Sequence, residues 1–217
     1  MNRRAKTRQW AERQAKDPWV RKARSRGLAA RSAFKLEEII RRHRLIRPGD
    51  RVLELGAAPG GWTRLAREAA GREGRVVAVD RLPMRAPEGV NFLQGDLTDE
   101  SVRNEALVLL GGAAAVVLCD LAPNLTGVAE TDSVNKAELG DLAAQMAAFA
   151  LKPGGALLVK TFSGESGDGL RQRLRGEYRQ VKALKPAASR AGSSEFYLLA
   201  MGFKPRPEAT AGPENAI

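Results

Sequence analysis

Two charged side chains in the second half of the sequence lie at the ends of apolar runs, where a reactive group could sit in a buried setting. Asp120 follows the run 114–119, and Lys160 comes near the end of the run 156–161. A lysine at the inner end of a buried strand is costly unless a counter-charge lies beside it, and Asp120 is the obvious partner. Such a pair is either a structural ion pair or the setting for a lysine that acts on protons.

Other catalytic chemistries lack the residues they need. The chain has a single histidine, His43, and a single cysteine, Cys119. A Ser–His–Asp triad, a His-ligated metal site, a cysteine zinc site and an internal disulfide framework are therefore not expected. His43 lies in a run of arginines far in sequence from any nucleophile, so we interpret it as a surface residue. We expect a site without metal.

A glycine-rich loop follows the first apolar run, 52–55. It reads Gly56-Ala57-Ala58-Pro59-Gly60-Gly61-Trp62. Glycines let the backbone approach a ligand closely, and in a doubly wound sheet the ligand lies beyond the carboxyl ends of the strands. The loop lacks both the Gly-Lys-Ser/Thr of a phosphate-binding loop and the G-x-G-x-x-G of a dinucleotide site. By itself it fits a cofactor site or a tight turn.

Two aspartates at the ends of the next apolar runs favour the cofactor site. Asp80 follows the run 75–79, twenty residues after Gly60, where an acid accepts hydrogen bonds from ribose hydroxyls. Asp96 follows the run 90–93 and could accept from an adenine amino group, although an aspartate that caps the next helix is a common alternative. A site that suits a nucleoside but lacks a phosphate-binding pattern favours S-adenosylmethionine over NAD as the cofactor.

The elements that must position these residues alternate along the chain. Further apolar runs cover 181–184 and 196–201, and helical patterns cover about 31–44, 62–70, 99–110, 134–151 and 167–176. Strands alternating with helices predict right-handed βαβ units, and therefore an α/β fold with a mostly parallel sheet. The last two runs are joined by a loop and no helix, which predicts an antiparallel pair at one edge.

The excess positive charge is confined to the beginning of the chain. Residues 1–47 hold 16 basic and 4 acidic residues, a net charge of +12, and residues 48–217 hold 20 and 21, a net charge of −1. A block of one sign indicates a polyanionic partner. Nucleic acid is favoured over a membrane because no large apolar helical face accompanies the charge.

The length of 217 residues suits one α/β domain. We divide the chain into a basic arm (1–24), a catalytic domain (25–204) and a polar, disordered tail (205–217). In the arm, Trp10 and Trp19 could stack on bases or pack on the domain, and we favour packing for Trp19. With no apolar stretch of about 20 residues and no secretory signal, we expect a cytoplasmic monomer that does not enter membranes.

Together these segments resemble the FtsJ-type RNA 2′-O-methyltransferases over about residues 25–204. The resemblance rests on residues 32–36, 55–62, 92–96, 120–124, 153–155 with 159–160, and 189–190 with 194–195. It implies a Rossmann-like class I S-adenosylmethionine-dependent methyltransferase with a seven-stranded sheet and helices on both faces. It also implies ribosomal RNA as the partner, most closely a uridine in 23S RNA within the large subunit.

The resemblance also assigns site residues. The family's catalytic Lys-Asp-Lys-Glu tetrad falls on Lys35, Asp120, Lys160 and Glu195. Its cofactor contacts fall on Gly60, Trp62, Asp80, Asp96 and Asp120, and we add Gly56 from the same loop. The implied reaction leaves S-adenosylhomocysteine as product.

Two questions stay open at this point. A ribose 2′-hydroxyl must lose its proton as it attacks the methyl group, and Lys160 could be the base if Lys35 lowers its pKa, or could orient the hydroxyl as a cation. Family members that modify transfer RNA share the tetrad, so the tetrad identifies the reaction and leaves ribosomal and transfer RNA as alternative substrates. The competing class is a non-catalytic RNA-binding protein of ribosome assembly.

Overall fold

The computed structural model of the chain describes residues 17–26, 28, 30–123, 127, 129–190 and 192–205. Most of the predicted arm, including Trp10, and the predicted tail beyond residue 205 lie outside the described residues. In the described part, no helix is long and apolar enough to cross a membrane.

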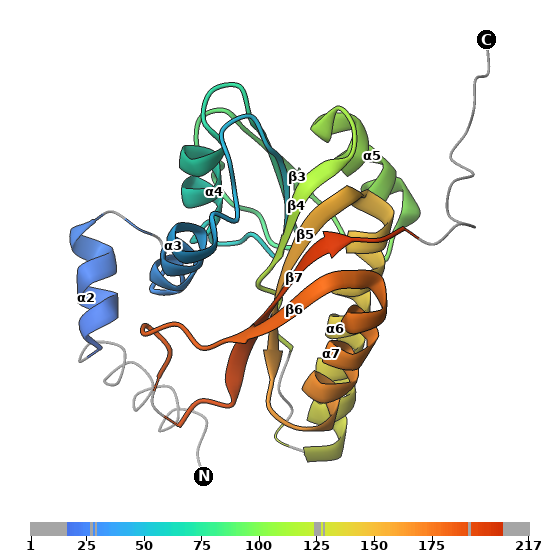
Figure 1. Cartoon of the computed structure of the whole chain (residues 1–217). Helices are drawn as coiled ribbons and strands as arrows, with labels where there is room; N and C mark the ends of the chain where they lie inside the picture. Colours follow the sequence, from blue (N-terminus) through green and yellow to red (C-terminus); the bar gives the residue numbers. More distant parts are fainter. Residues whose placement is uncertain are drawn as a thin grey trace.

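A seven-stranded sheet forms the centre of the fold, in the order β3-β2-β1-β4-β5-β7-β6 (Figure 1). The strands are β1 (Arg51–Leu55), β2 (Arg75–Asp80), β3 (Val90–Gln94), β4 (Ala114–Cys119), β5 (Leu151–Phe162), β6 (Tyr178–Leu184) and β7 (Glu195–Phe203). The pairs among β1–β5 are parallel, and β7 pairs antiparallel with both β5 and β6. The predicted mostly parallel sheet is confirmed, with the antiparallel strand β7 one place inside the edge.

Strand β5 begins five residues earlier than the apolar run that predicted it. Leu151 pairs with Ala114, but Ala156 pairs with Val116, so the register shifts between these two positions. The shift accommodates Pro153 and two glycines, of which Gly154 has a φ of 79°. These turn residues hid the first part of the strand from a search for apolar runs.

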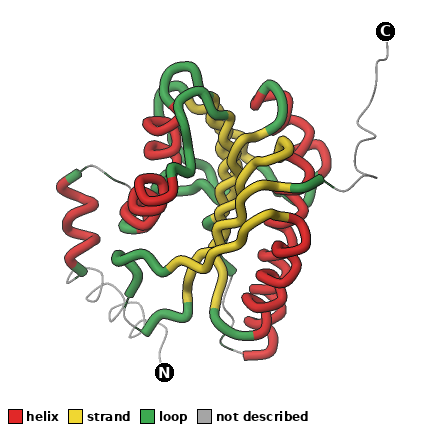
Figure 2. The backbone as a smooth tube through the Cα atoms, viewed as in Figure 1, coloured by secondary structure: helices red, strands yellow, loops and turns green. Residues whose placement is uncertain are grey.

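Helices cover both faces of the sheet (Figure 2). They are α2 (Pro18–Ser25), α3 (Ser32–His43), α4 (Thr63–Ala70), α5 (Glu100–Leu110), α6 (Ala129–Ala150) and α7 (Glu165–Glu177). Alternate strand residues enter two separate cores, as Leu53 packs with α5, α6 and α7 while Val52 packs with α3 and α4. Residues that follow Val52 at even spacing therefore point toward α3 and α4.

Helix α2 ties part of the predicted arm to the domain. The Trp19 ring lies 5.2 Å from the Phe34 ring, so packing of Trp19 is confirmed. The Asp17 carboxylate accepts the Trp19 N–H (3.0 Å) and forms an ion pair with Arg31. Arg31 also donates to the carbonyl of Ala188, before β7. The predicted boundary at residue 24 thus falls inside a helix that packs on α3.

Candidate active site

The carboxyl ends of four neighbouring strands bring the predicted site residues into one row. Leu55 pairs with Val79 and Cys119, and Cys119 pairs with Val159. The residues that come next along the four strands are Gly56, Asp80, Asp120 and Lys160. Since the side-chain direction alternates along a strand, the side chains of Asp80, Asp120 and Lys160 share the face that is covered by α3 and α4.

A cleft of about 720 Å³ opens at this edge of the sheet, a size typical of small-molecule sites. Three of the predicted cofactor residues, Gly56, Asp80 and Asp96, line it, together with the segment 121–123 after β4 and side chains of α6. Residues from five elements or loops therefore meet around one cavity.

The glycine at the entrance of the cleft is required by the geometry. Gly56 has a φ of 76°, and a Cβ there would lie 2.7 Å from the Leu121 side chain and 3.1 Å from its backbone nitrogen. Any larger residue would push the segment after β4 away from the loop after β1. The glycine thus keeps two walls of the cleft close together.

The two aspartates of the cleft are both held by backbone groups. Asp80 accepts the N–H of Ala58 and the N–H of Leu82, each at 2.8 Å. Asp96 accepts from the backbone and hydroxyl of Thr98, which hold its pKa below the usual range, and pairs with Arg81 at 2.7 Å. Each ionised carboxylate has about four acceptor positions, so both keep capacity for a ligand.

Three residues assigned to the cofactor by resemblance, Gly60, Trp62 and Asp120, are not among those that line the cleft. Asp120 directly precedes the lining segment 121–123. Trp62 is 1% exposed, because its indole turns toward α3, where it donates to the carbonyl of Ser32 at 3.0 Å. Gly60 has a φ of 92°, and its N–H donates to the carbonyl of Ala57, which closes the turn. In this structure Trp62 and Gly60 hold the conformation of the loop and do not face the cleft.

The predicted pairing of Lys160 with Asp120 is confirmed. The Lys160 Nζ lies 3.0 Å from Asp120 Oδ1 and also donates to the Asp120 backbone carbonyl at 2.7 Å. The two side chains are 8% and 19% exposed. Burial raises the pKa of Asp120 above its ordinary value, and the Lys160 ammonium opposes that shift.

The other two members of the candidate tetrad form a second pair. Lys35, on α3, contacts the Glu195 carboxylate at the start of β7. The Lys35 side chain is 8% exposed, so its charge needs this partner. Helix α3 and β7 thus supply a lysine–carboxylate pair from positions 160 residues apart in the chain.

Tyr197 joins the two pairs and was missed in the sequence. Its hydroxyl oxygen lies 3.4 Å from both Lys35 Nζ and Glu195 Oε1 and 3.5 Å from Asp120 Oδ1. Burial, followed by the charges of Asp120 and Glu195, raises the pKa of Tyr197, so it stays a neutral donor. Its position two residues after Glu195 on one strand face was the available signal, but the surrounding apolar run indicated only core.

Glu54 is a second residue that sequence analysis missed. It points to the same face as Asp120, one row deeper, and is 1% exposed. Its Oε2 has no hydrogen-bond partner in the described part of the chain. Burial raises the pKa of Glu54 to about 8; the Thr63 hydroxyl lowers it, and Asp120 and Asp80 raise it further.

Within the described ranges, no group of three or more His, Cys, Asp or Glu side chains could hold a metal ion. The arrangement instead offers a nucleoside-sized cleft beside two lysine–carboxylate pairs. Together with the sheet order, this defines the class of protein: a Rossmann-like methyltransferase.

The comparison with known proteins narrows the class to a family. The chain belongs to the FtsJ-like methyltransferase family, whose model matches residues 28–203. Proteins named ribosomal RNA large subunit methyltransferase E are similar to it along nearly their full length. The protein from Acidithiobacillus ferrooxidans is 42% identical over 94% of this chain and 93% of its own. The protein from Alkalilimnicola ehrlichii is 46% identical over 93% of this chain and 97% of its own.

Solved structures agree on the fold. A putative ribosomal RNA methyltransferase from Plasmodium falciparum has a TM-score of 0.73 at 23% identity and covers 82% of this chain and 99% of its own. Fibrillarin from Aeropyrum pernix, in complex with natively bound S-adenosyl-L-methionine, has a TM-score of 0.56 at 18% identity, over 78% and 73% of the two chains.

Proposed function

We propose that this protein transfers the methyl group of S-adenosylmethionine to a ribose 2′-hydroxyl of large-subunit ribosomal RNA. The observation that carries the proposal is the pair of lysine–carboxylate contacts, Lys160 with Asp120 and Lys35 with Glu195, at the strand ends beside the cleft. The names of relatives that are 42% and 46% identical support ribosomal RNA as the substrate.

The cleft fits the proposed cofactor. Asp80 and Asp96 offer acceptors for ribose hydroxyls and an adenine amino group, and Gly56 lets a ligand approach the backbone. When bound, the cofactor supplies an electrophilic methyl group on a sulfonium sulfur. Acidic side chains at the rim suit a ligand with positive charge.

The residues of the tetrad act on the proton of the ribose hydroxyl. An ammonium has three donors, and Lys160 uses two of them on Asp120, so the third can orient the hydroxyl. Asp120 takes the proton, because burial makes its carboxylate a stronger base than usual. Lys35, Glu195 and Tyr197 hold this pair in place, so that alignment supplies much of the rate.

The experiment that tests the proposal is methyl transfer from labelled S-adenosylmethionine to unmodified large ribosomal subunits, with transfer RNA in parallel. We expect label in a 2′-O-methylated nucleoside of ribosomal RNA after nuclease digestion. The Asp120→Asn variant is the inactive comparison, since an amide cannot take up the proton.

Two outcomes would contradict the proposal. Label found in transfer RNA alone would keep the chemistry and replace the substrate. Binding of the cofactor and of ribosomal RNA without transfer would identify a non-catalytic RNA-binding protein that kept the fold.

A further inference from the structure

A second concave surface lies at the opposite edge of the sheet, where the parallel strands begin. It is a cavity of about 240 Å³ between the end of α3, the start of β5 and the end of β7. We call it the amino-edge groove and define it by its basic residues His43, Arg44, Arg47 and Lys152. None of them contributes to the site described above.

The cations of the amino-edge groove are exposed and lack counter-charges. Arg44, Arg47 and Lys152 are exposed, and in the described part of the chain no carboxylate pairs with them. The one acid that lines the groove, Asp50, already accepts the backbone N–H of Arg47 at 2.8 Å. Fold stability does not require three unpaired cations in one place, so an external anion is the natural partner.

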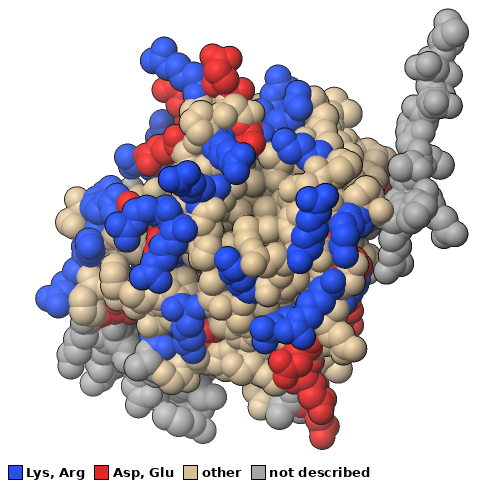
Figure 3. All heavy atoms as spheres, viewed as in Figure 1, with Lys and Arg blue, Asp and Glu red and all other residues tan. Residues whose placement is uncertain are grey.

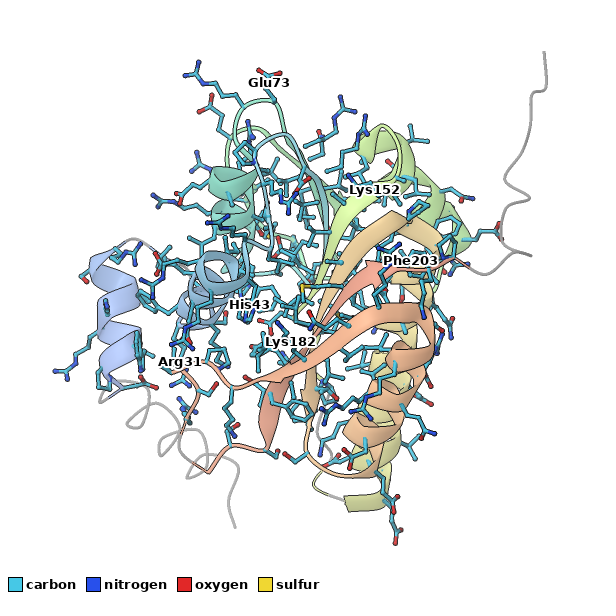
Figure 4. The ribbon with its side chains drawn as sticks, in the orientation of Figure 1. Arg31, His43, Glu73, Lys152, Lys182 and Phe203 are labelled. Atoms are coloured by element: carbon cyan, nitrogen blue, oxygen red, sulfur yellow. The ribbon has the colours of Figure 1, made fainter. Side chains whose placement is uncertain are left out.

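Further positive charge lies around His43. Burial lowers the pKa of His43 first, and the charges of Lys182 on β6 and of Arg42 lower it further. In Figure 4, His43 lies beside Lys182, and Lys152 is further along the same side of the molecule. Figure 3 shows lysine and arginine side chains surrounding a hollow on this face.

Helix α3 runs from the candidate active site to the groove. Lys35 lies in the first turn of α3, and His43 ends the helix eight residues later, which is about 12 Å further along the helix axis. The basic residues of segment 1–47 that the structure describes therefore lie in two separate places. One part lies with α2 near the start of α3, and the other lies at the far end of the same helix.

We propose that the amino-edge groove binds the sugar–phosphate backbone of the RNA substrate at a second place, at the other end of α3 from the ribose that is methylated. The proposal rests on the proposed function, because that function makes the substrate an RNA. Phosphate contacts position an RNA without reading its sequence, and exposed arginine and lysine side chains are the usual donors.

The composition of the groove favours RNA over a protein partner or a membrane. The large apolar side chains that are exposed in the described residues are Leu82, Val108, Val134 and Phe149, and none of them lines the groove. Protein interfaces normally centre on buried apolar or aromatic anchors, and membrane surfaces require an apolar face beside the charge. The groove offers unpaired positive charge instead.

The test compares a variant of the groove with a matched control in the full-length protein. The variant is Arg47→Gln with Lys152→Gln, and the control is Arg72→Gln with Arg175→Gln, two exposed arginines away from both concave surfaces. We expect the log–log salt slope of binding to large-subunit RNA to fall by about 1.4–1.8 in the groove variant, because two phosphates are no longer neutralised. The control should keep the wild-type slope, and the change in methyl transfer should be confined to KM.

The single histidine gives an independent readout by nuclear magnetic resonance. Adding a uridine oligoribonucleotide should raise the pKa of His43 in the wild type and in the control, because nearby phosphate charge favours the imidazolium. The rise should be smaller in the groove variant. Equal salt slopes for variant and control, or an unmoved His43 pKa, would overturn the proposal.

The failure of this inference can be told apart from failure of the proposed function. If the wild type methylates ribosomal RNA while the groove variant binds and reacts like the control, only the groove is wrong. A variant that loses activity on subunits but binds naked RNA normally would also overturn it, by pointing to a ribosomal protein as the partner.

Discussion

The contacts of Lys160 fit a catalytic role better than the role of a structural ion pair. Its ammonium group donates twice to Asp120, at 3.0 Å to the side chain and at 2.7 Å to the backbone carbonyl. A structural ion pair would need only the contact with the side chain. This geometry fixes the direction of the remaining donor. At the same scale, Tyr197 connects Asp120 to Glu195, so the four charged groups form one network and not two separate pairs.

Replacing Lys160 by alanine should abolish methyl transfer while cofactor affinity stays within a few-fold, because the lysine faces the proposed RNA ribose and does not line the cleft. Some loss of stability is expected, since Asp120 is left without its counter-charge. Transfer assays and calorimetry on folded protein measure the two effects. Turnover near the wild-type rate would remove Lys160 from the mechanism.

Glu54 predicts a specific dependence of stability on pH. Its pKa is raised from 4.5 to about 8 in the folded state, so its contribution to stability is complete below pH 4.5 and is lost as the pH rises through 8. Glu54→Gln removes this titration, so the variant should gain stability relative to wild type between pH 5 and 8. Urea unfolding at several pH values, with the exposed Glu73→Gln as control, measures the difference, and a constant difference would contradict the prediction.

Among the elements, α2 and α3 decide how the basic segment is attached. The pKa of Asp17 is lowered: burial acts to raise it, but the hydrogen bond and charge of Arg31 outweigh burial. The Asp17–Arg31 pair, extended to the Ala188 carbonyl, links α2, α3 and the loop before β7. Glu195 follows Ala188 by seven residues in the sequence, so these contacts tie α2 to the segment that precedes the candidate active site.

This arrangement predicts different results for two truncations. Removing residues 1–16 should leave stability and cofactor affinity intact, and should reduce the salt slope of RNA binding by about 0.7–0.9 for each phosphate that the arm neutralises. Removing residues 1–24 should also destabilise the domain, because Asp17 and Trp19 are deleted with the rest of the arm. Urea unfolding and a salt series on one RNA separate the effects. Equal stability of the two truncations would show that α2 does not support the domain.

At the scale of the whole molecule, the cleft brings the ends of four strands and one helix together around a single cavity. Its walls come from the ends of β1, β2, β3 and β4 and from α6, so a ligand that fills it touches most of the parallel half of the fold. Cofactor binding should therefore stabilise the domain as one unit, in proportion to affinity.

We expect about 2.7 kcal/mol of stabilisation at a cofactor concentration of one hundred times Kd. Asp80→Ala should weaken binding by about 1.5–3 kcal/mol, because it removes a charge-assisted bond to the ribose, and should reduce the stabilisation at the same concentration. Asp99→Ala is the matched control, since Asp99 is exposed and makes no capping bond from its side chain. Unchanged affinity in a folded Asp80→Ala variant would remove Asp80 from the cofactor site.

The order of the elements and the side of the sheet that carries the site were determined by the sequence. Apolar runs with turn residues between them located the seven strands of the described sheet, and Asp80, Asp96, Asp120 and Lys160 were predicted as site residues because they lie at or just beyond the carboxyl ends of these runs. These features are local, because strand length, alternation and the βαβ rule depend on neighbouring residues.

Only the tertiary structure decided how distant residues combine. The contact between Lys35 and Glu195 joins positions 160 residues apart, and the role of Tyr197 depends on three partners from different elements. The burial of Glu54 and the division of the basic block by the length of α3 are likewise set by packing. Sequence spacing carries no information on such contacts, because they depend on which faces of the helices and strands meet when the sheet is covered.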